Sequence, residues 1–239
     1  MKFSVSYEHR QFFQKQQHIE FDGLLTASQL VELKQAIEST LALRLAVEES
    51  SVHRQSADKL FMEGHDLWRA NEAIKKIDMN SILAGIAAEL VETKGLRLGY
   101  DQFLPDLSRR SYVTKGERPL ENFLKSAHTL NEMSGLQGIA CGLILCLSEP
   151  LKPELVATEH CFTQIPGNGV YISPDFAIDF QKLIPQQGTY LLIVYTEASA
   201  YYILNEGDPH AHVLKHLGYH FGDKLKDKLN PVVFRSSGG

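Results

Sequence analysis

The first part of the chain has its hydrophobic residues at helical spacing. Thr26 and Gln29 have the spacing of a capping box, in which each side chain satisfies a backbone donor of the first helical turn. Further helices are expected over residues 67–77 and 81–92, with Gly95 placed to end the second, and the polar residues 48–58 predict a loop. The apolar face of the helix after Thr26 consists of Leu30, Leu33, Ile37, Leu41 and Leu45.

From Leu96 onward the pattern changes to that of strands. Leu96, Leu98 and Tyr100 alternate with polar or small residues, which places them on one face of a strand. Later apolar runs predict four more strands at 138–147, 169–173, 190–204 and 232–234. Helices followed by strands, without βαβ alternation, indicate an α+β fold with an antiparallel β core and N-terminal helices packed against it. We expect a single domain over 1–239, mainly helical in 1–95 and with the β core in 96–235.

Composition limits the possible functions. The chain has 239 residues, a formal charge of -5 and a pI of about 6.1, which gives no support to nucleic-acid binding. Three cysteines are too few for a disulfide framework, and a reducing compartment follows. The N-terminus has no apolar signal segment, and the longest apolar run is too short for a membrane helix. We therefore expect a cytoplasmic protein without membrane or nucleic-acid partners.

Several stretches occur in the order found in a known family. Phe21-Asp22-Gly23-Leu24-Leu25 with the helix after Thr26 resembles the opening of phytanoyl-CoA dioxygenase-like proteins. The stretch from Leu96 to Gln102, the run 138–147 and the region from Gly188 to Tyr219 are similar to that family's later blocks. The resemblance implies a double-stranded β-helix, also called a jelly roll and cupin-like, of the Fe(II)/2-oxoglutarate oxygenase type.

The chemistry implied by the resemblance needs a His-x-Asp/Glu pair, a distal histidine and an arginine that binds the oxoglutarate carboxylate. The pair should fall between Asp101 and Gly138, where the single histidine, His128, is followed by Thr129 and Leu130. The sequence from Ala198 to Tyr202 contains no histidine, and no arginine occurs between Arg118 and Arg235. The only His-x-Glu, at His18, precedes the first long helix, and Lys215 could replace the arginine only in a shifted alignment.

A histidine cluster follows Pro209. His210 and His212 would share the face of a strand, whereas His212, His216 and His220 would form a stripe on a helix. Leu214, Leu217 and Phe221 favour the helix. On that helix the three histidines are more simply explained as partly exposed surface residues than as metal ligands. Other candidates are weaker: His160 cannot easily activate the adjacent Cys161 on a strand, and Cys141 and Cys146 would face opposite ways.

The leading hypothesis is a protein with an oxygenase-like jelly-roll fold that lacks the iron and oxoglutarate site. Such a protein would bind a small molecule in the mouth of the barrel or a protein partner, with no catalytic, cofactor-binding or metal-binding residue and no cofactor. The alternative is an active enzyme that uses Fe(II) and 2-oxoglutarate with relocated ligands, for which the candidates are His128, His160, His210 and His212.

Overall fold

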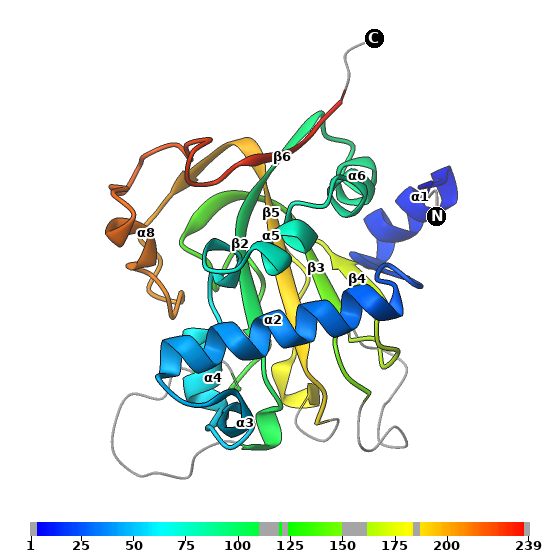
Figure 1. Ribbon diagram of the computed structural model, residues 1–239. Coiled ribbons are helices and arrows are strands. Elements are labelled where there is room, and N and C mark those ends of the chain that lie inside the picture. Colours follow the sequence, from blue (N-terminus) through cyan, green and yellow to red (C-terminus); the bar gives the residue numbers. More distant parts are fainter. Residues whose placement is uncertain (1–3, 110–119, 121–123, 150–161, 184–186, 237–239) are drawn as a thin grey trace.

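A computed structural model describes residues 4–109, 120, 124–149, 162–183 and 187–236 (Figure 1). Helices dominate the first part of the described chain. The helical segments are α1 (Tyr7–Gln16), α2 (Ala27–Leu45), α3 (Glu49–Val52), α4 (Ala57–Glu63), a 3-10 turn at Leu67–Arg69, α5 (Glu72–Asp78), α6 (Ser81–Leu90), 3-10 turns at Leu107–Arg109 and Phe180–Leu183, and α8 (Val213–His216).

Six strands form one antiparallel sheet that curls into half a barrel. The strands are β1 (His18–Phe21), β2 (Gly95–Leu104), β3 (Leu136–Cys146), β4 (Gly169–Ile172), β5 (Tyr190–Tyr202) and β6 (Val232–Arg235). Their order across the sheet is β1-β4-β3-β5-β2-β6. The long strands β3 and β5 lie at the centre, in a register that pairs Leu143 with Ile193. The antiparallel core predicted from the succession of helices and then strands is confirmed, and β1, from the mainly helical region, joins its edge.

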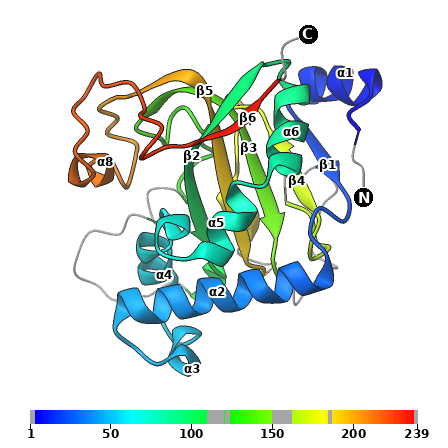
Figure 2. The ribbon, with the colours of Figure 1, turned by 45° about the horizontal axis from the view of Figure 1, so that its top comes forward.

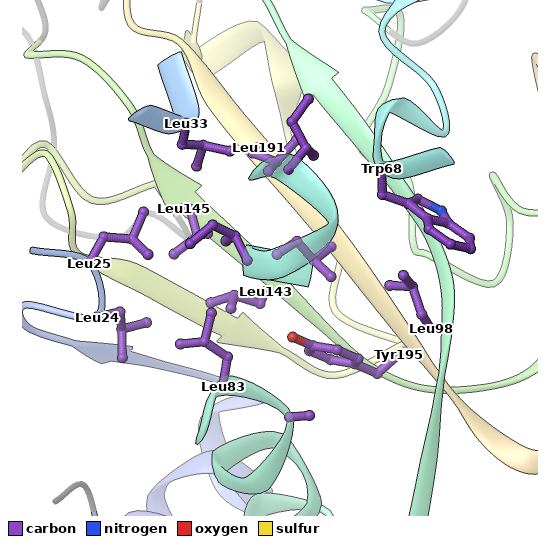
Figure 3. Close-up of a cluster of buried hydrophobic side chains, with 14 of the residues drawn as sticks. Leu24, Leu25, Leu33, Trp68, Leu83, Leu98, Leu143, Leu145, Leu191 and Tyr195 are labelled. Carbon is purple, nitrogen blue, oxygen red and sulfur yellow. The ribbon is translucent and has the colours of Figure 1, made fainter. Parts of the chain in front are cut away.

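One face of the sheet, here called the helix face, is covered by α2, α5 and α6 (Figures 1 and 2). The capping box predicted at Thr26 is present: its hydroxyl accepts the Gln29 N–H, and the Gln29 side chain accepts the Thr26 N–H. Buried leucines of α2, α6 and the central strands pack into one cluster, seen in Figure 3 with Leu33, Leu83 and Leu143. This cluster fixes the helices on the sheet.

The opposite face, here called the barrel face, is covered by irregular segments, within 124–134, 162–183 and 203–230. Their apolar side chains form a second core with the alternate residues of the strands. Ile144 of β3 belongs to this second core, whereas its neighbour Leu143 belongs to the first. The two cores are therefore separated by the sheet itself.

A β-bulge at Gly99 changes the facing of β2. Leu98 and Tyr100 lie opposite the consecutive residues Tyr195 and Val194 of β5, so Gly99 is an extra residue. A Cβ at Gly99 would lie 3.0 Å from the Val194 carbonyl oxygen, which leaves little room for any other residue. Leu98 consequently packs on the helix face and Tyr100 on the barrel face. The prediction that the two share a face was wrong because simple alternation does not include the bulge.

Other local predictions also differ from the structure. The predicted loop 48–58 contains α3 and, from Ala57, the start of α4, which Ser56 caps through its side chain. The helix that starts at Ser81 ends at Leu90, and Glu92 adopts a left-handed conformation before Gly95 begins β2. The helix expected after Pro209 is only α8, because the chain turns at Gly218, which has φ +86°.

Candidate functional site

The polar residues on the barrel face gather around His65 and His210. His65 follows α4, and its backbone pairs with Gln102 of β2, which brings the imidazole against Tyr100 at a ring-centroid distance of 5.1 Å. His210 approaches from the irregular C-terminal segment, and Phe61 lies 5.7 Å from its ring. The two imidazoles stack with centroids 4.1 Å apart and planes 15° apart. The other polar side chains that line this part of the barrel face lie around this stacked pair.

Both stacked histidines are neutral. Burial lowers the pKa of His65 to about 3, although a hydrogen bond with Gln102 opposes the shift. Burial, followed by the neighbouring His65, lowers the pKa of His210 to about 2. His65 Nδ1 and His210 Nε2 are buried without a hydrogen-bond partner in the described part of the protein. Each therefore has one imidazole nitrogen that the described residues leave without a hydrogen bond.

The stacking geometry does not suit a shared metal ion. An imidazole binds a metal along a lone pair in the plane of its ring, at about 2.0–2.1 Å for zinc. Because the two rings are nearly parallel and 4.1 Å apart, these lone pairs cannot converge on one ion. Within the described ranges, no group of three or more histidine, cysteine, aspartate or glutamate side chains is arranged to hold a metal. The donor set therefore does not fit an iron site.

Asp208 is an acidic residue beside the pair, and backbone donors occupy its carboxylate. Oδ1 accepts the His210 N–H at 2.7 Å and Oδ2 accepts the Gly135 N–H at 2.6 Å. Burial raises its pKa to about 6, while the two backbone hydrogen bonds oppose that shift. Asp208 therefore joins two irregular segments.

The space beside the histidines is small. A cavity of about 20 Å³ is lined by His65, Tyr100, Gln102, Asp208 and His210 together with apolar side chains that include Met133 and Leu192. That volume suits about one water molecule, whereas small-molecule sites usually have about 300–1,000 Å³. A second cavity beside the same histidines is equally small, so within the described residues the barrel is filled by its own side chains.

The positions at which the resemblance implies ligands have other roles. His128 is half-buried, its backbone pairs with Ile178, and its ring contacts the Ser126 hydroxyl at 3.4 Å. Leu130, where the acid of the pair is expected, is fully buried in the barrel-face core. Lys215, considered as a substitute for the arginine, lies 4.2 Å above the exposed ring of Phe221. These residues do not converge on a common centre.

The remaining candidates are scattered. His212 is exposed beside α8, and His216 and His220 are also exposed, so the predicted stripe on one helix is not formed. His160 and Cys161 lie outside the described residues. Cys141 and Cys146 face opposite sides of the sheet, as the odd spacing predicted, and burial raises the pKa of both thiols. Of the proposed metal ligands that the structure describes, only His210 lines the barrel cavity. It lies there beside His65, which local sequence patterns did not single out.

A larger cavity of about 430 Å³ lies on the helix face. Ile37 and Leu41 of α2, Leu60 of α4 and Phe103 of β2 form part of its apolar lining. Lys34, Glu38 and Glu149 are among the charged residues that border it. Its volume falls in the range of small-molecule sites.

The folded chain has the architecture of the non-haem iron and 2-oxoglutarate oxygenases, a curled antiparallel sheet with N-terminal helices. SnoK, described as a non-heme alpha ketoglutarate dependent carbocyclase from nogalamycin biosynthesis, is 14% identical and superimposes with a TM-score of 0.66 over 96% of both chains. The epimerase SnoN from the same biosynthesis is 14% identical, with a TM-score of 0.62 over 94% of this chain and 96% of its own. CT296 from Chlamydia trachomatis is 19% identical, with a TM-score of 0.46 over 83% and 99%.

Sequence comparisons add no further assignment. No family model matches the chain, and no curated protein matches it. At 14% identity, the likeness to SnoK and SnoN establishes the fold alone. None of the helices in the described ranges has the length and apolar character required to span a bilayer.

Proposed function

We propose that the protein is a binding protein with an oxygenase-like fold, whose ligand occupies the cavity on the helix face. The observation that carries this proposal is the difference between the two cavities, about 20 Å³ on the barrel face and about 430 Å³ on the helix face. A small molecule fits the second volume and not the first. The expected ligand site therefore moves from the mouth of the barrel to the opposite side of the sheet.

The side chains on the barrel face support a function other than iron-dependent oxidation. The stacked histidines cannot share one ion, Asp208 is bonded to two backbone N–H groups, and Leu130 stands where an acid is expected. A buried oxoglutarate carboxylate would need a paired cationic donor, and no arginine occurs between Arg118 and Arg235. SnoK and SnoN are described as alpha ketoglutarate dependent enzymes, and we do not transfer that activity to this chain.

The lining indicates the chemistry of the ligand. Apolar side chains from α2, α4 and β2 would bury a hydrophobic body, while Lys34, Glu38 and the hydroxyls of Ser148 and Thr189 would contact polar groups at the border. A small amphipathic molecule satisfies both conditions. Burial of its apolar part would supply most of the affinity, and the polar border would select its orientation.

Filling the cavity tests this proposal. Val52 is 6% exposed and lines the cavity, so Val52→Trp should occupy part of its volume. The matched control is Val31→Trp, because Val31 is 55% exposed on α2. The probe is 8-anilinonaphthalene-1-sulfonate, whose fluorescence rises in apolar sites. We expect Val52→Trp to weaken saturable probe binding at least about tenfold and Val31→Trp to leave it unchanged.

Circular dichroism and urea unfolding would verify that both variants are folded. Equal probe affinity in folded Val52→Trp and in the original protein would contradict the proposal. Native mass spectrometry of the purified protein provides a second test, because a small molecule that co-purifies should be lost from Val52→Trp and kept by Val31→Trp. Retention of that molecule by both variants would also contradict it.

A further inference from the structure

Two carboxyl groups meet in the core between the helix layer and the sheet. Asp78 is the last residue of α5 and Asp101 lies in β2, and both are fully buried. Their side chains are in hydrogen-bonding contact with each other. Asp101 faces the helices because of the bulge at Gly99, which reverses the facing of the rest of β2.

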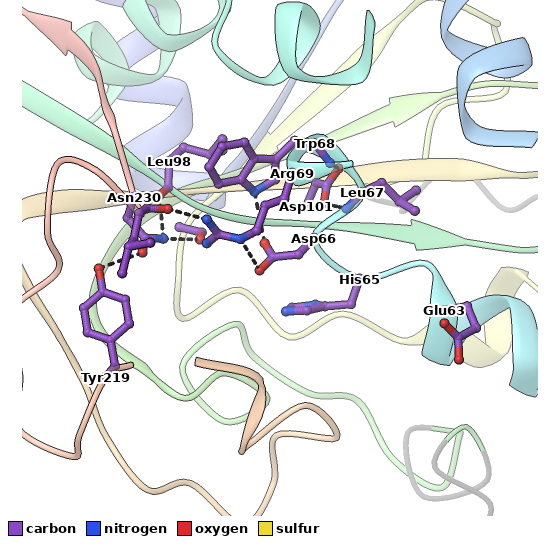
Figure 4. Close-up of polar contacts among 12 residues, drawn as sticks. Glu63, His65, Asp66, Leu67, Trp68, Arg69, Leu98, Asp101, Tyr219 and Asn230 are labelled. Carbon is purple, nitrogen blue, oxygen red and sulfur yellow. Dashed lines mark hydrogen bonds and ion pairs between the residues drawn. The ribbon is translucent and has the colours of Figure 1, made fainter. Parts of the chain in front are cut away.

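The two carboxyl groups have unequal surroundings. Asp101 Oδ1 accepts the Leu67 N–H at 2.6 Å, and its Oδ2 accepts the Trp68 N–H at 3.1 Å (Figure 4). Asp78 has no N–H or O–H donor on either oxygen within the described part of the chain. Backbone donors favour the charged form of Asp101, whereas the carbonyl end of α5 disfavours charge on Asp78. These surroundings favour the charge on Asp101 and the proton on Asp78.

Among the described residues, the ionisable neighbours supply no cation that acts on the pair. Asp66 adds negative charge, and Arg69 is bound to Asp66, with Nε 2.7 Å from Oδ2 (Figure 4). Arg44 donates to the backbone carbonyls of Glu63, His65 and Asp66. From the sheet, the neutral Tyr195 faces Asp78, and Cys141 lies beside Tyr195. If both carboxyl groups were charged, their mutual repulsion would not be offset by a neighbouring cation.

Burial has the expected effect on both groups. It raises the pKa of Asp78 well above its ordinary value, and the adjacent Asp101 and Asp66 raise it further. Burial, followed by Asp66, raises the pKa of Asp101 to about 7, while its hydrogen bonds oppose the shift. The direction of both pKa shifts and the burial of the pair therefore indicate that the folded protein keeps a proton that the unfolded chain would release.

We propose that Asp78 and Asp101 form a proton-dependent latch that holds α5 and the Leu67–Arg69 turn on the sheet. In the closed latch, the Asp78 hydroxyl donates to the Asp101 carboxylate, and the Asp101 oxygens also accept the N–H groups of the turn. Loss of the proton leaves two buried negative charges in contact, which weakens the attachment of α5. The latch is independent of any ligand in the helix-face cavity.

The direction of the pH effect follows from proton linkage. Because the folded pKa values lie above the unfolded ones, the folded state binds more protons and is destabilised as pH rises. The loss of stability begins near the ordinary carboxyl pKa of about 4. It continues up to a pH of about 7 for Asp101 and to higher pH for Asp78. Each proton kept by the folded state contributes about a tenfold rise in the unfolding constant per pH unit.

The central test compares Asp78→Asn with the original protein in urea unfolding from pH 6 to pH 9. The amide introduced at position 78 donates to Asp101 at every pH. The pH dependence of the unfolding constant should therefore decrease by one proton in the variant, and at pH 9 its unfolding constant should be at least about tenfold smaller than that of the original protein. The matched control is Glu72→Gln on the same helix, because Glu72 is 87% exposed and its removal should leave the slope unchanged. An Asp78→Asn slope equal to that of the original protein would overturn the latch.

Two further measurements assign the donor. Asp101→Asn should weaken the protein at every pH, because an amide nitrogen cannot accept the Leu67 or Trp68 N–H; stabilisation by Asp101→Asn alone would contradict the assignment. If Asp78→Asn does not fold, carbon NMR of labelled aspartates in the original protein gives the answer directly. The latch predicts that the Asp78 carboxyl is protonated at pH 6, and two Asp carboxyls both titrating near pH 4 would overturn it.

Discussion

On the helix face the sheet is covered by helices, whereas on the barrel face it is covered by irregular chain. A helix satisfies most of its own backbone hydrogen bonds, so α2 and α6 attach mainly through apolar contacts. An irregular segment needs partners for its buried backbone groups, and the barrel face supplies them from side chains. Asn205 alone donates to the carbonyls of Asn131, Glu132 and Ser134.

This difference explains where open space remains. On the barrel face, side chains that pack around the irregular segments leave two cavities of about 20 Å³ each beside the stacked histidines. On the helix face, a cavity of about 430 Å³ remains between α2, α4 and the end of β2. Within the described residues, the barrel face is therefore packed as a core, and the larger space lies on the helix face.

The largest expected effects come from truncating neighbouring core residues on the two faces. Leu143 and Ile144 are both fully buried, Leu143 on the helix face and Ile144 on the barrel face. Leu143→Ala and Ile144→Ala should each lower the free energy of unfolding by about 3 kcal/mol, because each leaves a cavity in a packed core. Urea unfolding measures both. A loss below about 1 kcal/mol for Ile144→Ala alone would indicate an open barrel and break the comparison.

A somewhat smaller effect is expected from the side-chain bonds that close the barrel face. Asn230 is fully buried, donates to the carbonyls of Leu98 and Gly99, and accepts the Tyr219 hydroxyl (Figure 4). Asn230→Ala leaves these groups unpaired and should cost about 2–3 kcal/mol of unfolding free energy. Tyr219→Phe removes only the hydroxyl and should cost about 1 kcal/mol. Equal, negligible losses in thermal and urea unfolding would show that side chains do not hold this segment.

The stacked histidines predict acid sensitivity. Their folded pKa values, about 3 for His65 and about 2 for His210, lie below the ordinary value of about 6.5, so stability is present above that pH and decreases as pH falls. At pH 5 the free energy of unfolding should be lower by about 2 kcal/mol for each histidine than it is well above the ordinary pKa. His210→Gln should reduce the slope of unfolding free energy between pH 6.5 and 4 by one proton. The exposed His216→Gln is the control, and an identical slope in both variants would refute the burial argument.

The smallest effect should come from the start of α2. Thr26→Ala removes a capping bond to the Gln29 N–H and should cost about 1 kcal/mol of unfolding free energy, whereas the neighbouring Ser28→Ala should cost less. Thermal unfolding of both variants measures the difference. A loss for Ser28→Ala as large as that for Thr26→Ala would show that the cap does not stabilise the helix layer.

Local patterns predicted the elements better than the contacts between them. The β-branched run from Tyr190 and the capping box at Thr26 gave a central strand and the main helix. The glycine in Leu98-Gly99-Tyr100 was a possible signal of a bulge, yet alternation alone placed Tyr100 on the wrong face. The contacts of His65 with His210 and of Asp78 with Asp101 join residues distant in sequence, so no local spacing identifies them.

The most direct test of the filled barrel is a titration with Fe(II) and 2-oxoglutarate under anaerobic conditions, followed by calorimetry and by visible absorption. If the barrel face is a packed core, oxoglutarate should show no binding that depends on Fe(II), and no charge-transfer absorption should develop. One-to-one binding of oxoglutarate that requires Fe(II), and that His65→Gln or His210→Gln abolishes, would contradict this account.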